Sequence, residues 1–178
     1  ITRRWAGRAI PLVQIRLDGS DGRPAPADGA AQGEVVIRAP WLTQTYVNNP
    51  EAGAALWAGG WLHTQDVASQ EPQGDIVLRD RLKDVIKTGG EWVSSTEIEN
   101  LALGDPDIVE AAVVGAPDAR WGERPVLFPV ARPGRSPSLG ALKARLTPMA
   151  ADGRISRWAI PDRLIVIGAL PLTSVGKI

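Results

Sequence analysis

The chain has 178 residues, 44% of them hydrophobic and 22% charged, which is typical of a globular protein able to bury a sizeable core. Twenty basic residues balance twenty acidic ones, so no overall field attracts nucleic acid or anionic lipid. The chain contains no cysteine, which excludes disulfides and thiolate chemistry.

Residues 1–80 are expected to be rich in β-strands. Short apolar stretches bounded by turn residues predict four strands, at residues 13–17, 34–38, 61–67 and 75–78. Between them, Asn49, Pro50 and Glu51 predict a helix start, because a capping side chain, a fixed φ and an acid at the positive dipole end coincide. We expect Gly59 and Gly60 to end that helix.

The second half mixes strands with helices. Its strands are predicted at residues 85–87, 91–93, 110–114, 125–131 and 163–167. Ser94 and Glu97 form a capping box that opens a helix reaching about residue 103, with Gly104 expected to follow it as the C′ residue. Ser138 is expected to cap a second helix, over residues 139–149.

These elements predict an α+β protein with a boundary near Asp80 and Arg81. Residues 1–80 would form a β-rich segment. Residues 81–178 would form a small α+β domain, a mixed sheet flanked by helices. Because the sequence starts at Ile1 and stops at Ile178 without a polar tail, we expect it to be part of a longer chain.

Residues 60–66 (Gly-Trp-Leu-His-Thr-Gln-Asp) are the first segment suited to chemistry. A carboxylate at a strand end, such as Asp66, can accept hydrogen bonds from both hydroxyls of a ribose. The alternative is an ordinary turn-forming aspartate, which is commoner. His63 is the only histidine and has no partner at ligand spacing, so we expect a packed or surface residue rather than a metal ligand or base, and no metal site.

The second segment is residues 80–92 (Asp-Arg-Leu-Lys-Asp-Val-Ile-Lys-Thr-Gly-Gly-Glu-Trp). Gly89 and Gly90 permit positive φ and allow a ligand to approach the backbone closely. Arg81 and Lys87 could hold phosphate oxygens. The alternative is a solvated charged linker followed by a hairpin turn.

The third segment, residues 171–177, is a loop shaped by proline and glycine that presents Lys177. A single lysine is ordinarily a solvated surface charge, and on physical grounds alone that alternative is favoured. The loop becomes informative only together with the other two segments.

In this order and spacing, the three segments closely resemble the adenylate-forming superfamily of acyl-CoA synthetases, adenylation domains and luciferases. Residues 80–100 are especially similar to the fatty acyl-CoA synthetase branch, which favours Asp-Arg-Leu-Lys-Asp followed by Gly-Gly-Glu-Trp. The likeness covers essentially the whole chain, including residues 33–35 and 112–118. It implies that residues 1–80 close a large AMP-binding domain and that residues 81–178 form its mobile C-terminal lid.

The resemblance also implies roles for eight residues in binding and catalysis. Asp66 would bind the ribose of ATP, Arg81 and Lys87 the nucleotide, and Gly89, Gly90 and Trp92 the pantetheine of CoA, while Lys83 would be the hinge and Lys177 the catalytic lysine of adenylation. Gln65 departs from the family pattern, which usually has glycine before the ribose aspartate.

The implied parent protein is a cytoplasmic fatty acid–CoA ligase that uses ATP, Mg²⁺ and CoA, with the Mg²⁺ ligands outside this fragment. We expect no nucleic-acid partner and no transmembrane segment, and we expect the fragment alone to be inactive. Two alternatives stay open. One is an aryl- or other acid–CoA ligase of the same superfamily, and the other is a non-catalytic module that binds CoA, nucleotide or a partner domain.

Overall fold

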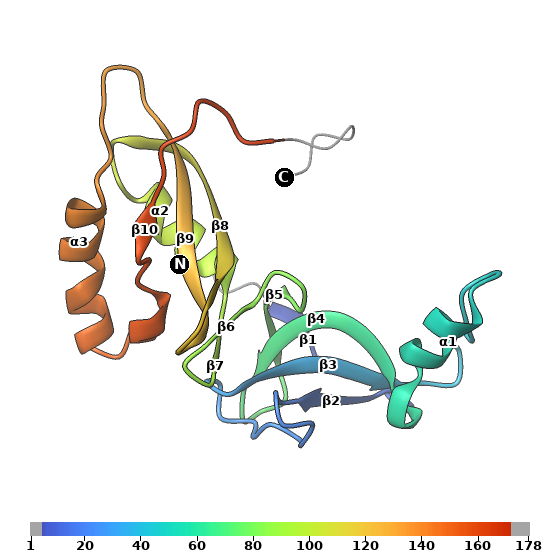
Figure 1. The fold of residues 1–178 in the computed structure, drawn as a ribbon. Helices are drawn as coiled ribbons and strands as arrows, with labels where there is room; N and C mark the ends of the chain where they lie inside the picture. Colours follow the sequence, from blue (N-terminus) through green and yellow to red (C-terminus); the bar gives the residue numbers. More distant parts are fainter. Residues whose placement is uncertain (1–4, 172–178) are drawn as a thin grey trace. The chain divides into compact units, whose positions relative to one another are not determined.

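The computed structural model describes residues 5–171 and divides into two compact units, Ile1–Lys83 (unit 1) and Asp84–Ile178 (unit 2), shown in Figure 1. The division falls shortly after the boundary expected at residues 80–81. Each unit contains its own β-sheet, and together with the few helices these sheets confirm the predicted α+β class. Within residues 5–171, no helix is both long and apolar enough to cross a bilayer.

Unit 1 is built on a five-stranded antiparallel sheet in the order β1-β5-β4-β3-β2. Its strands are β1 (Trp5–Gly7), β2 (Gln14–Asp18), β3 (Gln32–Arg38), β4 (Leu62–Gln70) and β5 (Ile76–Arg81). One side of the sheet buries Leu17, Val35, Ala68 and Ile76 as its core. The four predicted strands are therefore confirmed. The short β1 was not predicted, because Trp-Ala-Gly is too brief to show alternation.

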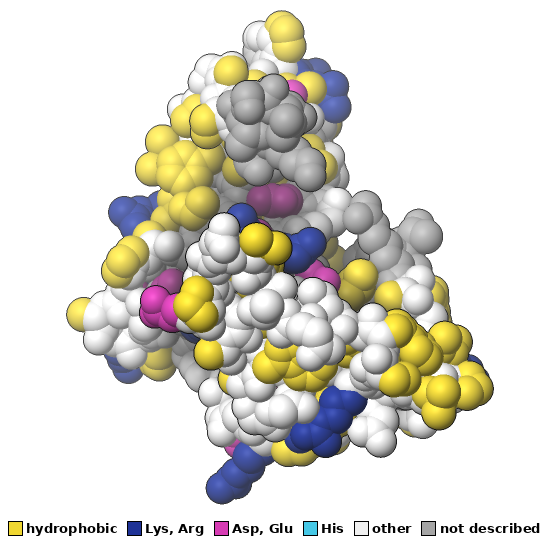
Figure 2. Space-filling model, turned by 90° about the vertical axis from the view of Figure 1, so that its right-hand side faces the viewer, with side chains coloured by type: hydrophobic (Ala, Val, Ile, Leu, Met, Phe, Trp, Pro, Cys, Tyr) yellow, Lys and Arg dark blue, Asp and Glu magenta, His cyan; other side chains and the backbone are white. Residues whose placement is uncertain are grey.

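The α-helix of unit 1, α1 (Pro50–Leu56), begins as the sequence predicts. The Asn49 side chain accepts a hydrogen bond from the backbone N–H of Ala52 at 3.0 Å. The helix ends ahead of the glycine pair, which lies in a 3₁₀ turn, η1 (Ala58–Gly60). The preceding loop leaves Trp41, Tyr46 and Val47 exposed, and Figure 2 shows hydrophobic side chains at the surface among polar ones.

The sheet of unit 2 is organised around β9 (Gly122–Ala131). One edge of β9 pairs antiparallel with β8 (Ile108–Asp118) over nearly its whole length. Its other edge pairs with β6 (Ile86–Thr88) at Gly122 and with β10 (Arg163–Leu164), which runs parallel. The sheet is therefore mixed, as predicted, and β7 (Glu91–Val93) extends it as the hairpin partner of β6.

The helices α2 (Ser95–Leu103) and α3 (Leu139–Ala151) both share the core with this sheet. Ser94 accepts a hydrogen bond from the N–H of Glu97 at 3.1 Å, and Ser138 accepts one from Ala141 at 3.2 Å, so both predicted caps are confirmed. The buried core residues include Ile86, Ile98, Ile108, Leu127, Leu142 and Leu146.

Three further details differ from the sequence-based expectation. The strand predicted at residues 163–167 is shorter, because β10 ends at Leu164 and Ile167 forms only an isolated bridge with Val130. Gly104 ends α2 as its C-cap but is right-handed, with φ of −71°, rather than a C′ residue. A Cβ there would lie 3.1 Å from the Arg145 guanidinium and 3.3 Å from the Leu101 carbonyl oxygen, so a larger residue would require these neighbours to shift slightly. The strands β8 and β9 also extend further than predicted, because their long mutual ladder continues through Pro117 at a sheet edge, where proline is tolerated.

We predict that Leu127→Ala lowers the free energy of unfolding of unit 2 by about 2–5 kcal/mol, the usual cost of a cavity at a fully buried leucine. Urea unfolding of the chain, followed by circular dichroism, measures the change. Leu103→Ala is the matched control, because Leu103 is 44% exposed and its truncation should cost less than about 1 kcal/mol. Equal effects of the two substitutions would contradict the assignment of the core.

Candidate functional site

Asp66 and Arg81, both predicted to bind nucleotide, lie opposite each other on β4 and β5. Their side chains form an ion pair with Arg81 Nε 2.9 Å from Asp66 Oδ1. The Arg81 side chain is 60% exposed and that of Asp66 is 32% exposed, and pairs this open to water contribute only about 0–1 kcal/mol. A ligand that offers hydroxyl donors could therefore compete for the carboxylate at small cost.

The backbone before Asp66 is held by the buried carboxylate of Glu34. Glu34 Oε1 accepts hydrogen bonds from the backbone N–H of Gln65 at 3.1 Å and from its side-chain amide at 3.2 Å. The Thr64 hydroxyl donates to the Val35 carbonyl at 2.7 Å on the same side. These bonds fix an irregularity in the pairing of β3 with β4, directly before the predicted ribose aspartate.

His63 completes this arrangement. Its Nδ1 lies 2.9 Å from Glu34 Oε2, and its Nε2 lies 3.2 Å from the carbonyl oxygen of Ala58. Among residues 5–171 no group of three or more His, Cys, Asp or Glu side chains could hold a metal ion. These two contacts make His63 a packed residue, one of the two situations expected for it.

Gln65 has a left-handed backbone, with φ of 63°. This conformation costs a non-glycine residue about 1–2 kcal/mol, which gives a physical reason for the glycine usual at this position in the resembling family. The Gln65 side chain bonds to Glu34, and the bond offsets part of this strain.

We predict that Gln65→Gly is more stable than Gln65→Ala by about 1 kcal/mol, because both lose the bond to Glu34 while only glycine relieves the strain. Chemical denaturation of the two variants measures the difference. A Gln65→Ala variant as stable as Gln65→Gly would show that the left-handed backbone carries no strain.

In unit 2, the predicted CoA residues and Lys87 gather in the β6–β7 hairpin. Gly89 and Gly90 form its two-residue turn, with φ of 59° and 82°, the pair of positive φ angles that a type I′ hairpin turn requires. Lys87 and Trp92 face each other across the strands, and the Lys87 side chain is exposed. The backbone N–H of Lys87 donates to Glu123 Oε2 at 2.8 Å.

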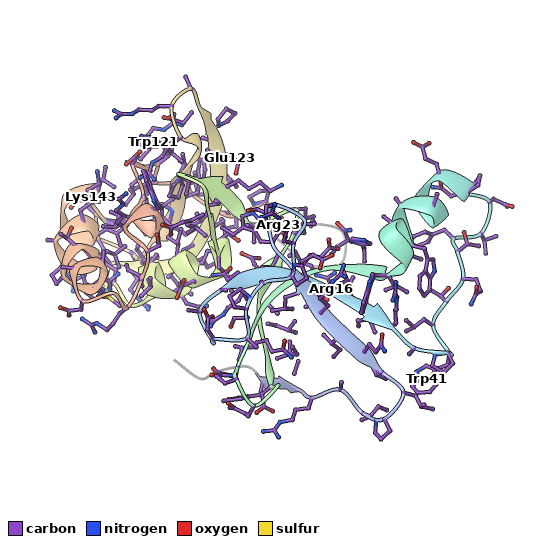
Figure 3. The ribbon with its side chains drawn as sticks, turned by 90° about the horizontal axis from the view of Figure 1, so that it is seen from below. Arg16, Arg23, Trp41, Trp121, Glu123 and Lys143 are labelled. Carbon is purple, nitrogen blue, oxygen red and sulfur yellow. The ribbon has the colours of Figure 1, made fainter. Side chains whose placement is uncertain are left out.

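The turn lies against two tryptophans that sequence reasoning missed. A Cβ at Gly89 would overlap the ring of Trp158, so glycine is required there by contact as well as by φ. The Trp158 ring lies 4.6 Å from that of Trp121, whose carbonyl accepts the Gly89 N–H at 3.0 Å. Figure 3 labels Trp121 and Glu123, which flank Gly122, the first residue of β9, in the sequence.

Arg124 joins the segments around this turn. Its guanidinium bonds to both carboxylate oxygens of Asp162, at 2.6 Å and 3.0 Å, and its side chain is only 12% exposed. The hydrogen bonds from Arg124 hold the pKa of Asp162 below its usual range, and the positive charges of Arg124, Lys143 and Arg163 act in the same direction.

This lowered pKa predicts a loss of stability in acid. Because the folded pKa of Asp162 lies below the unfolded value of about 3.9, the pair stabilises the fold fully above that pH. The stabilisation is lost as pH falls through the lower, folded pKa. We expect Asp162→Asn to be less stable near neutral pH and to lose less stability on acidification, measured by urea unfolding at a series of pH values.

Asp152→Asn is the matched control, because the Asp152–Arg154 pair is largely exposed on both sides and should change stability by less than about 1 kcal/mol. If Asp162→Asn kept the full acid dependence of the unsubstituted chain, the role of the Arg124 pair would be disproved.

The remaining two predicted residues lie in different situations. Lys83 is exposed and is the last residue of unit 1. Lys177 lies outside the described residues, so its catalytic role stays a prediction. The structure thus brings Asp66 together with Arg81 in unit 1, and Lys87 together with Gly89, Gly90 and Trp92 in unit 2.

Comparison with known proteins identifies the second unit. Residues 97–177 match the AMP-binding enzyme C-terminal domain. Residues 97–177 belong to the C-terminal domain family of the AMP-binding enzymes. This agrees with the family that the sequence motifs predict.

Individual relatives extend the likeness to nearly the whole chain. It is 40% identical to the 3-methylmercaptopropionyl-CoA ligase of Ruegeria lacuscaerulensis, over 99% of this chain and 31% of the relative. It is 41% identical to the long-chain-fatty-acid–CoA ligase of Thermus thermophilus, over 96% of this chain and 31% of the relative. The chain therefore spans about a third of the length of these relatives.

A solved structure has the same fold. The o-succinylbenzoate CoA synthetase from Bacillus subtilis, in complex with its acyl-adenylate intermediate, matches with a TM-score of 0.76 and 28% identity. The match covers 98% of this chain and 34% of that one.

Proposed function

We propose that this chain is the C-terminal portion of an ATP-dependent fatty acid–CoA ligase and that it is inactive alone. The observation that carries the proposal is the alignment of almost the whole chain with CoA ligases about three times its length. The parent enzyme would work in the cytoplasm, where ATP and CoA are both present.

The proposed reaction has two steps. In the first, a carboxylate oxygen of the acid attacks the α-phosphorus of ATP, so that an acyl–phosphate bond forms and pyrophosphate leaves. In the second, the thiol sulfur of CoA attacks the acyl carbon, the bond to phosphate breaks, AMP leaves and the thiol proton is released. Negative charge builds at the α-phosphate in the first step, where a cation such as Lys177 would stabilise it.

Unit 1 supplies the proposed nucleotide contacts. The Asp66 carboxylate is partly exposed and would accept hydrogen bonds from the ribose hydroxyls. Arg81, whose present bond to Asp66 is weak, would turn toward ribose and phosphate. Lys87, which is exposed on the hairpin of unit 2, would add a further phosphate contact.

Unit 2 would act as a lid that serves both steps. The catalytic lysine is needed during adenylation and must then give way to the thiol, which would pass along Gly89, Gly90 and Trp92. Rotation about Lys83 would exchange the two faces. The position of Lys83 at the division between the units supports this role.

Mg²⁺ would enter bound to ATP. We propose that its protein ligands lie in the part of the parent enzyme outside this chain, as the resemblance to acyl-CoA synthetases implies. No residue of this fragment is assigned to the metal.

The fatty acid is the finer part of the proposal. It rests on residues 80–100, which are similar to the fatty acyl branch, while the relatives are named for acids as different as 3-methylmercaptopropionate and long-chain fatty acids. Steady-state assays of the full-length enzyme with fatty, aryl and short thioether acids would decide. A higher kcat/KM for an aryl acid would replace the fatty-acid assignment with that alternative.

A non-catalytic binding module is the alternative from another functional class. The DNA upstream of Ile1 separates the two. A coding sequence with a Ser/Thr/Gly-rich loop ending in lysine and a downstream Thr-Glu would support the ligase, because such loops bind the phosphates of ATP. A start codon just upstream would support the module.

We predict that Lys177→Ala in the full-length enzyme slows acyl-adenylate formation by about 10²- to 10³-fold, the usual effect of losing one contact to a transition-state charge. Thioester formation from supplied acyl-adenylate should stay nearly unchanged, because the lysine acts only in the first step. Pyrophosphate exchange and thioester formation from synthetic adenylate measure the two steps separately.

Lys143→Ala is the matched control, since Lys143 is a lysine of α3 to which no catalytic role is assigned, and both rates should be unaffected. Unchanged pyrophosphate exchange in Lys177→Ala would remove this lysine from the mechanism.

A further inference from the structure

Arg124 makes more hydrogen bonds than an ordinary structural ion pair needs. Beyond its two bonds to Asp162, it donates to the Thr88 hydroxyl at 3.3 Å, the Trp158 carbonyl at 3.4 Å and the Ile160 carbonyl at 3.2 Å. These acceptors belong to two segments far apart in sequence, the end of β6 and the stretch around the 3₁₀ turn η2 (Arg157–Ala159). One guanidinium therefore ties the two segments together.

Both tied segments meet at the glycine turn. Thr88 is fully buried and immediately precedes Gly89. Trp158 is the side chain whose ring lies against Gly89. The Arg124 guanidinium also lies 5.3 Å from the centroid of the Trp158 ring. Arg124 thus contacts the residue before Gly89 and the side chain that packs against Gly89.

We propose that Arg124 is a positioning residue for the thioester step, which holds Trp158 and Thr88 so that the Gly89–Gly90 turn keeps one fixed shape. The inference rests on the proposed function, because it takes this turn as the path of the acceptor thiol. Arg124 touches neither substrate in this view. It acts through Trp158, and its loss leaves the adenylation step intact.

The chemistry of the guanidinium explains why the residue at position 124 is an arginine. Five N–H donors in a planar fork can serve a carboxylate and several neutral acceptors at the same time. A lysine ammonium is a compact charge with three donors and cannot span the same set. Removing the guanidinium would also leave Asp162 without its bidentate partner and the carbonyls of Trp158 and Ile160 without this donor.

The first test uses the 178-residue chain itself. Amide hydrogen exchange and ¹⁵N relaxation of Gly89 and Gly90, together with the Trp158 indole signal, report the mobility of the turn. In Arg124→Lys we expect exchange at both glycines to accelerate at least about 10-fold, because local opening loses its restraint. Arg145→Met is the matched control, since Arg145 is a half-buried arginine that donates to the Leu101 carbonyl at 2.6 Å.

The second test measures both half-reactions in the full-length enzyme. Arg124→Lys should lower kcat for thioester formation from supplied acyl-adenylate by about 10- to 100-fold, the scale of a small misplacement of reacting groups. Pyrophosphate exchange should change by less than about 3-fold, and Arg145→Met should leave the ratio of the two rates unchanged. If Arg124→Lys fails to fold, Thr88→Val replaces it, because it removes only the hydroxyl that Arg124 contacts.

The outcomes separate the two proposals. If the unsubstituted enzyme forms no CoA thioester, the proposed function fails, whatever Arg124 does. If it forms the thioester, equal losses in both half-reactions of Arg124→Lys, or a ratio like that of Arg145→Met, would overturn the positioning role. Full thioester activity in Arg124→Lys would overturn it as well.

Discussion

Strand β9 is the constraint on which unit 2 depends, because β6, β8 and β10 all pair with it. On the edge away from β8, β6 reaches it only at Gly122, and β10 reaches it at residues 126–127. Between these two points the side chains of Glu123 and Arg124 replace the ladder, Glu123 by accepting the Lys87 N–H and Arg124 by bridging to Thr88 and Asp162. The gap in the sheet is thus closed by charged side chains, and the glycine turn lies beside it.

In unit 1, the buried carboxylate of Glu34 also stabilises an irregular stretch of backbone. A carboxylate as enclosed as that of Glu34 is costly unless it is well bonded, and here it faces both His63 and Gln65. Those contacts hold the left-handed backbone at Gln65 and the irregular pairing that precedes Asp66. In both units a charged group thus shapes the backbone next to the predicted ligand-binding residues.

Local signals in the sequence were sufficient for most of the fold. The caps at Asn49, Ser94 and Ser138 act on neighbouring residues, and their effect can be read from a few positions. The close packing at Gly104 could not be predicted this way, because it involves Arg145 on another helix. The same limit applies to the site, where the Gly-Gly turn was visible but its contacts with Trp158 and Arg124 arise only from tertiary packing.

Glu34 in unit 1 and Arg124 in unit 2 each fix the backbone beside predicted binding residues, and this bears on how the proposed two-step enzyme could work. A lid that rotates must change the surroundings of the reacting atoms while each set of binding groups keeps its own geometry. Glu34 fixes the backbone beside Asp66 entirely within unit 1, and Arg124 fixes the turn at Gly89 entirely within unit 2. Because the bonds of Glu34 and Arg124 described above stay within their own units, the proposed rotation about Lys83 would leave both of them unchanged. In an enzyme whose binding groups were positioned by contacts between the units, each movement of the lid would disrupt the geometry of those groups.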